Sequence, residues 1–226
     1  MTDASREAEA ILRRAEETLV TARHGFEDLT GPSRSRRMTG LRNLIVFGRS
    51  VTWVLQNLKT PLGCHFEQWY EAKQAEMKAD ALMRYFVEAR NNLEKQGRVP
   101  VSTQAHIHSF SSGDISKFGP PPAGAIGFFI ADQLGGSGWE VELPDGSKQK
   151  YYVELPTEVA EVRQHFVGLP EALEPELRGK PVEELCELYL ARLDTLLDQA
   201  RQEFLGADPR QRQGGRVLPS YLRVVK

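Results

Sequence analysis

The sequence predicts an α+β protein that is mainly α: a bundle of about five helices with a small antiparallel β-sheet inserted before the last long helix. Three observations predict this class. Apolar residues recur at helical spacing through most of residues 5–97. Period-two segments rich in Gly and Pro follow between residues 99 and 155, and helical spacing returns over 181–204.

These changes of pattern predict four parts of the chain. They are the N-terminal part of a helical bundle at 1–97, a small antiparallel β insertion at 98–156, helices that complete the bundle at 157–206, and a basic C-terminal tail at 207–226.

Composition excludes several classes of protein. The 226 residues carry a net charge of −2, with 40% apolar and 27% charged residues, as in an ordinary globular protein and unlike a general nucleic-acid binder. No apolar run approaches the ~20 residues of a membrane helix, and no signal peptide is recognisable. Cys64 and Cys186 are interpreted as two buried thiols. We therefore expect a cytoplasmic protein with no membrane partner.

Residues 41–59 are expected to form the central helix. One apolar stripe runs along it, and further apolar residues such as Phe47 and Trp53 lie off that stripe, so we expect packing on two sides. Polar rows at seven-residue spacing run between the apolar faces, and a nearly buried helix rarely carries such rows without partners. The stripe consists of Leu41, Leu44, Ile45, Gly48, Val51, Leu55 and Leu58, and the polar rows of Arg42, Arg49 and Gln56 and of Asn43, Ser50 and Asn57.

The remaining elements follow from periodicity and from helix and turn signals. Asp80 is expected to cap a helix that Gly97 closes, and Asp145-Gly146 predicts a hairpin turn. Further helices are expected at 5–29, 66–78, 81–97 and 181–204, with a short one at 157–168; strands at 99–110, 125–132, 139–143 and 148–155; and a loop at 30–40.

The sequence holds few signs of a metal or cofactor site. His106 and His108 would point to one face of a strand, but a zinc site needs three or four ligands at fixed distances. The glycines at 135–138 do not lead from a strand into a helix and are not followed by Lys, so they predict a turn and no phosphate loop. We therefore expect no metal and no cofactor.

The segment Ala89–Lys95 carries a family resemblance. Its Arg90-Asn91 pair near the end of a helix, together with the order of the helices, resembles the HEPN superfamily (higher eukaryotes and prokaryotes nucleotide-binding). The resemblance implies a helical bundle, often dimeric, and many members cleave RNA without a metal through a motif R-N-x-x-x-H. Lys95 stands here at the position of the His, so the resemblance implies a non-cleaving member: a nucleotide- or nucleic-acid-binding module, an antitoxin-like partner or a structural relative.

Three hypotheses remain open. In the first, a non-catalytic binding protein holds an anion, such as the phosphate of a nucleotide or nucleic acid, where Arg42, Arg49 and Gln56 face Arg90 and Asn91. In the second, an RNA-cleaving toxin or defence protein uses Arg90 with Lys95 or with a histidine from a partner chain. In the third, the polar rows are internal pairs of a structural or assembly protein. A homodimer and a protein partner are expected only through the family resemblance.

Overall fold

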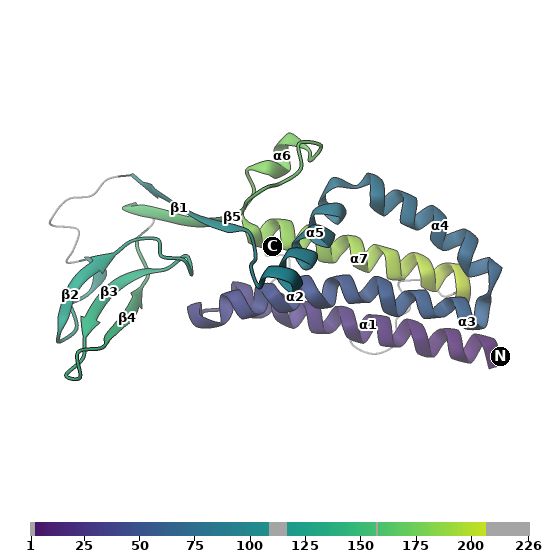
Figure 1. Cartoon of the computed structure of the whole chain (residues 1–226), viewed down its shortest axis with the longest axis horizontal. Coiled ribbons are helices and arrows are strands. Elements are labelled where there is room, and N and C mark those ends of the chain that lie inside the picture. The colour runs from purple at the N-terminus through teal and green to yellow at the C-terminus, as the bar shows by residue number, and fades with distance from the viewer. Residues whose placement is uncertain (1–2, 109–116, 157, 207–226) are drawn as a thin grey trace, which may run out of the picture.

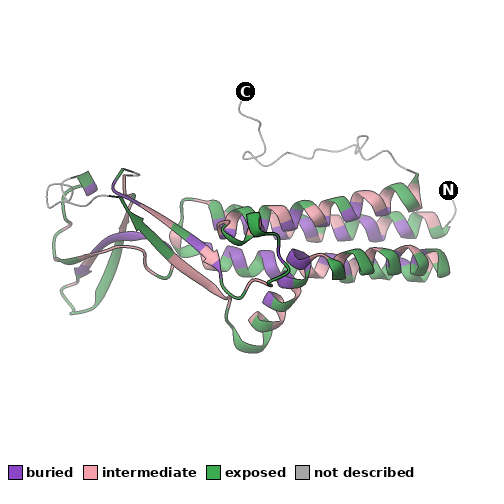
Figure 2. Ribbon diagram, turned by 90° about the horizontal axis from the view of Figure 1, so that it is seen from above, coloured by how far each residue is buried: buried purple, intermediate pink, exposed green. Residues whose placement is uncertain are grey.

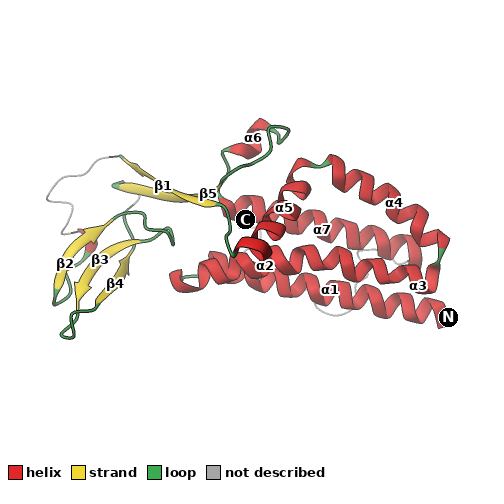
Figure 3. Ribbon diagram, viewed as in Figure 1, coloured by secondary structure: helices red, strands yellow, loops and turns green. Residues whose placement is uncertain are grey.

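The computed structural model describes residues 3–108, 117–156 and 158–206, and it confirms a mainly helical α+β fold. Helices occupy one end of an elongated molecule and strands the other (Figure 3). The expected basic tail at 207–226 lies outside the described residues.

The three longest helices run side by side along the long axis of the molecule (Figure 1). They are α1 (Asp3–Thr30), α2 (Arg34–Leu55) and α7 (Val182–Leu205). The shorter helices α4 (Cys64–Ala79) and α5 (Ala81–Gln96) complete the bundle. The connections are the 3-10 turn η1 (Gln56–Leu58), α3 (Lys59–Leu62) and α6 (Pro175–Arg178).

The expected core of the bundle is confirmed, but the prediction of two buried thiols is wrong for Cys64, which is exposed, whereas Cys186 is buried. Buried residues line the facing sides of the helices (Figure 2), and they include every member of the predicted stripe. The expected packing of α2 on a second side is wrong for Phe47 and Trp53, whose exposed fractions are 37% and 41%. The described helices that pack on α2 cover its stripe and leave these two rings partly uncovered.

The helix α2 begins earlier than the sequence predicted, because residues 34–40 are helical and do not form a loop. Ser33 takes the N-cap position in an extended conformation, directly after Pro32. Two residues of the added turns are buried. Arg37 pairs with Glu183 of α7, and Gly40 packs against α1. Tertiary contacts therefore extend a segment whose glycine, proline and arginines suggested a loop.

Two glycines allow the backbones of α1 and α2 to touch. A Cβ atom added at Gly25 would lie 2.6 Å from the carbonyl oxygen of Gly40, and one added at Gly40 would lie 2.5 Å from the carbonyl oxygen of Gly25. These obstacles are backbone atoms, so no side-chain rotation could relieve them. The close spacing of α1 and α2 therefore requires glycine, which has no side chain, at both positions.

The strands form two antiparallel sheets, where the sequence predicted one. In the first sheet, β1 (Val101–Ile107) pairs with β5 (Ala160–Phe166). In the second, β2 (Ala125–Phe129), β3 (Ser137–Glu142) and β4 (Lys148–Val153) pair in that order. The hairpin between β3 and β4 is confirmed by the hydrogen bond from the Leu143 amide to the Ser147 carbonyl, at 2.8 Å.

The helix expected at 157–168 is wrong, because β5 occupies most of this segment. Ala160, Gln164 and Phe166 are buried and Val162 is half-buried, so the even-numbered residues face inward with the period of a strand. The apolar residues alone did not reveal this period, since the buried member at position 164 is a glutamine.

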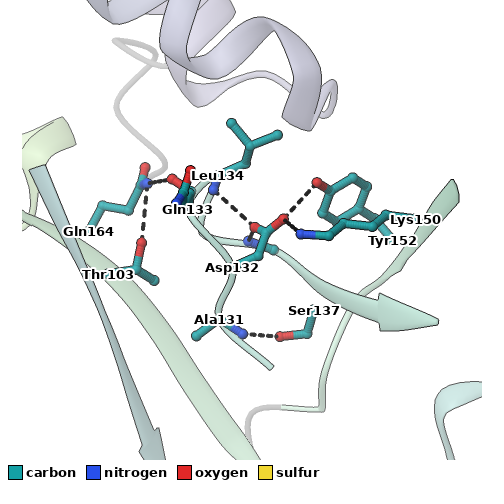
Figure 4. A network of polar contacts seen from close by, with 10 residues as sticks. Thr103, Ala131, Asp132, Gln133, Leu134, Ser137, Lys150, Tyr152 and Gln164 are labelled. Atoms are coloured by element: carbon teal, nitrogen blue, oxygen red, sulfur yellow. Dashed lines mark hydrogen bonds and ion pairs between the residues drawn. The ribbon is translucent and has the colours of Figure 1, made fainter. Parts of the chain in front are cut away.

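A polar network joins the two sheets (Figure 4), and Arg37 of α2 connects it to the helical bundle. Gln164 of β5 donates to the Gln133 carbonyl at 3.1 Å and accepts from Arg37 of α2 at 3.4 Å. Asp132 accepts from the Tyr152 hydroxyl at 2.8 Å and from Lys150 at 2.9 Å. Partial burial alone would raise the pKa of the Asp132 carboxyl, but these bonds and two from backbone amides lower its pKa below the ordinary value.

The substitution Gly40→Ala tests the contact between α1 and α2. We expect it to lower the free energy of unfolding by about 1–3 kcal/mol, because a new methyl group must push two backbones apart. Urea denaturation measures the loss. Gly179→Ala is the control, since Gly179 has φ −90° and nothing within 4 Å of an added Cβ. Equal stability of the two variants would contradict the contact.

Candidate functional site

A cavity of about 670 Å³ lies between α2, α4, α5 and the segment that follows β5. Its volume falls within the range of pockets for small molecules, about 300–1,000 Å³. The lining combines an apolar wall with a smaller polar set. The apolar and aromatic members are Tyr70, Met77, Met83, Tyr85, Val87, Ala89, Pro100, Val167, Pro170 and Tyr189; Arg49, Thr52, Gln74, Lys78, Arg84, Glu88, Asn92 and Gly168 complete the lining.

The turn between α4 and α5 positions one wall of the cavity. Asp80 alone separates the two helices and caps α5, because its carboxylate accepts a hydrogen bond from the Met83 amide at 3.0 Å. This cap was predicted from the sequence. It fixes Met77 at the end of α4 and Met83 at the start of α5, and both side chains line the cavity. Methionine side chains are flexible, so this wall can adapt to the shape of a ligand.

Arg49 supplies a positive charge that no carboxylate balances among the residues that the structure describes. It is half-buried, donates to the Thr52 hydroxyl, and lies with its guanidinium carbon 5.0 Å from the ring centroid of Trp53. Thr52 also lines the cavity and is buried. Neither contact neutralises the guanidinium group, because a hydroxyl and an indole carry no negative charge.

Several other shielded arginines of this protein are paired with acids. Arg201 makes two hydrogen bonds to the Glu16 carboxylate, at 2.7 and 2.9 Å, and Arg37 pairs with Glu183. Such pairing is the usual arrangement, since an unpaired charge loses hydration when it is buried. Arg49 departs from it and lies at the wall of a cavity, where an anion could provide the missing charge.

Two tyrosine hydroxyls lie near Arg49. Burial raises the pKa of Tyr70, and the positive charge of Arg49 opposes that rise; the same two effects act in the same directions on the pKa of Tyr189. Both phenols are therefore neutral near pH 7. The Tyr189 side chain is only 2% exposed, yet the hydrogen bonds among the described residues include none from its hydroxyl. A ligand in the cavity could supply that partner.

A glycine places Tyr189 against α2. A Cβ atom added at Gly48 would lie 2.6 Å from the Tyr189 ring and 3.2 Å from its hydroxyl oxygen. The same ring is stacked on Phe86, with 3.9 Å between the centroids and 3° between the planes. Gly48 and Phe86 therefore fix the Tyr189 ring against α2, one residue before Arg49.

Arg90 approaches the same indole as Arg49 but differs from it in charge balance. Its guanidinium carbon lies 4.4 Å from the Trp53 centroid, and it forms an ion pair with Glu94. The Arg90 Nε atom is buried and has no hydrogen-bond partner. The structure thus brings Arg49 and Arg90 to one ring, while a carboxylate already neutralises Arg90.

The other residues of the predicted site lie in different surroundings. Arg42 donates to the Gly97 carbonyl at 3.1 Å and does not line the cavity. Gln56 is exposed and donates to the Thr52 carbonyl of its own helix at 3.1 Å. Asn91 accepts from Arg90 at 3.5 Å. Only Arg49 of the predicted set lines the cavity, because the seven-residue rows drift around the helix and end against different neighbours.

Sequence reasoning missed the wall of the cavity. The residues predicted to form a site did not include Tyr70, Met77 or Tyr189. A signal was present in Tyr189, because a phenol on a buried helical face requires a partner for its hydroxyl. Nothing in the local sequence indicated that Val167 and Pro170 would close the cavity.

Three further observations limit what the described residues can do. They contain no group of three or more His, Cys, Asp or Glu side chains placed to hold a metal ion, although the His106 and His108 rings lie 4.7 Å apart. A second hollow, of about 640 Å³, lies between α1 and α2, and its lining includes both Arg14 and Glu17. Within the same described ranges, no helix is both long and apolar enough to span a membrane.

The geometry defines a class of protein: a mainly helical α+β chain with an arginine-bearing, largely apolar cavity between its helices. Residues 23–115 match the family model described as Bacteriophage lambda protein ea47, so the chain is similar to that family from the end of α1 through β1. The matched range includes Arg49 and the helices α2, α4 and α5. No curated protein and no solved structure matches the chain.

A double-mutant cycle tests whether Trp53 holds Arg90. We expect Trp53→Leu and Arg90→Gln to show a coupling energy of about 0.5–1 kcal/mol in urea denaturation, the usual strength of a cation–π contact at an exposed site. The pair Trp53→Leu with Arg42→Gln is the control and should be additive, since these residues share no contact. A coupling no larger than the control would show that the guanidinium group does not bind the ring.

Proposed function

We propose that this chain is a non-catalytic binding protein whose helical bundle holds a small anionic ligand in the cavity beside Arg49. The proposal is supported chiefly by one observation: Arg49 is half-buried at the cavity wall and has no carboxylate partner among the described residues. An arginine suits this role because its guanidinium group stays charged and offers several donors to a phosphate or carboxylate.

The neighbouring donors support an anion further. Thr52 and Tyr70 carry hydroxyl groups at the same cavity, and the Tyr189 phenol has no hydrogen bond among the described contacts. Lys78 and Arg84 add positive charge to the lining, which contains one carboxylate, that of Glu88. A hollow of this volume between helices favours a discrete ligand, such as a nucleotide phosphate, over the continuous backbone of a nucleic acid.

The alternative of metal-independent RNA cleavage is supported less well. Arg90 is paired with Glu94, and Lys95, at the position of the histidine in the resembled motif, is exposed and does not line the cavity. The purely structural alternative accounts for Arg90 but leaves the charge of Arg49 unexplained. A cytoplasmic location and a homodimer stay predictions.

The substitution Arg49→Gln tests the proposal. Isothermal titration calorimetry with inorganic phosphate, AMP and octanoate is expected to show that at least one of these anions binds the unmodified protein. The variant should bind that anion at least ~10-fold more weakly, because a charge-assisted hydrogen bond is worth roughly 1.5–3 kcal/mol.

Two controls make the loss specific. Arg42→Gln removes the same charge from the same helix outside the cavity and should leave affinity unchanged. Arg49→Lys keeps the charge and should retain most of the binding. Thermal unfolding establishes that each variant is folded. Equal affinity of Arg49→Gln and the unmodified protein for all three anions would refute the proposal.

A further inference from the structure

The apolar side chains of the cavity wall indicate the chemistry of the uncharged part of the ligand. Beyond the polar groups around Arg49, the lining is formed by Met77, Met83 and Val87 from α4 and α5 and by Val167 and Pro170 from the segment after β5. Such side chains give little to the ribose hydroxyls or the second and third phosphates of a nucleotide. They favour hydrocarbon, because each buried methylene group removes apolar surface from water.

The charges in the cavity are also unevenly placed. Arg49 and Thr52 lie together on α2, and Thr52 is buried, whereas Lys78, Arg84 and Glu88 are exposed residues of α4 and α5. These three side chains are exposed, so water and salt screen the attraction of Lys78 and Arg84 for a second anionic group more than that of the half-buried Arg49 for the first. One guanidinium group beside shielded hydroxyls matches one anionic head group.

We infer that the ligand of this cavity is a monoanionic amphiphile: one carboxylate or comparable anionic head at Arg49, with an alkyl or ring body along the methionine-bearing wall. This inference rests on the proposed function and narrows its ligand class. Met77 and Met83 let the wall adapt to bodies of different length, and the Tyr189 hydroxyl is available as a second donor to the head group.

A homologous series of ligands tests the inference. Calorimetry is carried out on the full chain with acetate, butanoate, hexanoate and octanoate, and with 1-octanol and AMP for comparison. We expect affinity to rise by about fourfold for each added methylene group, as burial of hydrocarbon predicts. Octanoate should bind at least ~10-fold more tightly than 1-octanol, because the alcohol leaves Arg49 without a counter-charge.

Two variants test separately the contribution of the anionic head group and that of the hydrocarbon body of the ligand. Arg49→Gln should weaken octanoate at least ~10-fold and leave 1-octanol unchanged. Val87→Trp should fill part of the cavity and reduce the gain in affinity with chain length. Val20→Trp is its control, because Val20 is 48% exposed on α1 and does not line the cavity. Thermal unfolding of each variant excludes a loss of fold.

The outcomes distinguish the inference from the function on which it rests. If anions bind through Arg49 but affinity is independent of chain length, or AMP exceeds octanoate, the inference is overturned and the anion site stands. If affinity rises with chain length but Arg49→Gln has no effect, or 1-octanol matches octanoate, both are overturned. Absence of binding by every ligand also overturns both.

Discussion

The contact between the backbones of α1 and α2 at Gly25 and Gly40 is the constraint on which the rest of the bundle depends. It sets the rotation of α2 about its own axis, so that the apolar stripe faces α1, α5 and α7. With that rotation fixed, Gly48 meets the ring of Tyr189 and Arg49 reaches the cavity. A close approach between helices far from the cavity therefore determines which polar residue of α2 becomes available to a ligand.

The same rotation separates residues that the sequence places in one row. Arg42, Arg49 and Gln56 recur at seven-residue spacing, yet Arg42 binds the end of α5 and Gln56 binds its own helix. Because an α-helix has 3.6 residues per turn, a seven-residue row turns gradually around the axis. The environment of each member is then set by the neighbour at that height. Of these three residues, only Arg49 lines the cavity.

The lack of a carboxylate partner among the described residues identifies Arg49 as a candidate binding residue. Several shielded arginines elsewhere pair with carboxylates, as Arg201 does with Glu16 and Arg23 with Asp194 at 3.1 Å. These pairs stabilise the bundle without leaving a free charge. Arg90 pairs with a carboxylate, that of Glu94, and also lies over the Trp53 ring that Arg49 contacts. Arg49 has no carboxylate partner among the described residues, and it lies beside apolar walls that strengthen its field.

The sequence predicted much of the helical architecture, because periodic apolar residues and local caps such as Asp80 carry that information within a few turns. It did not predict β5, whose inward position is held by the polar Gln164, or the early start of α2, which depends on Glu183 of a distant helix. Arg49 was identified from its position on an apolar helix. The wall formed by Met83, Val167 and their neighbours could not be predicted, since it assembles from segments that meet only in the folded chain.

The most direct measurement of the central idea is an NMR titration of the arginine side chains, in which the Nε–Hε resonance of Arg49 is assigned by its loss in the Arg49→Gln variant. During addition of octanoate, the account predicts that the Arg49 resonance shifts and saturates at the midpoint found by calorimetry, while that of Arg42 stays in place. Saturation of octanoate binding with an unchanged Arg49 resonance would contradict the account.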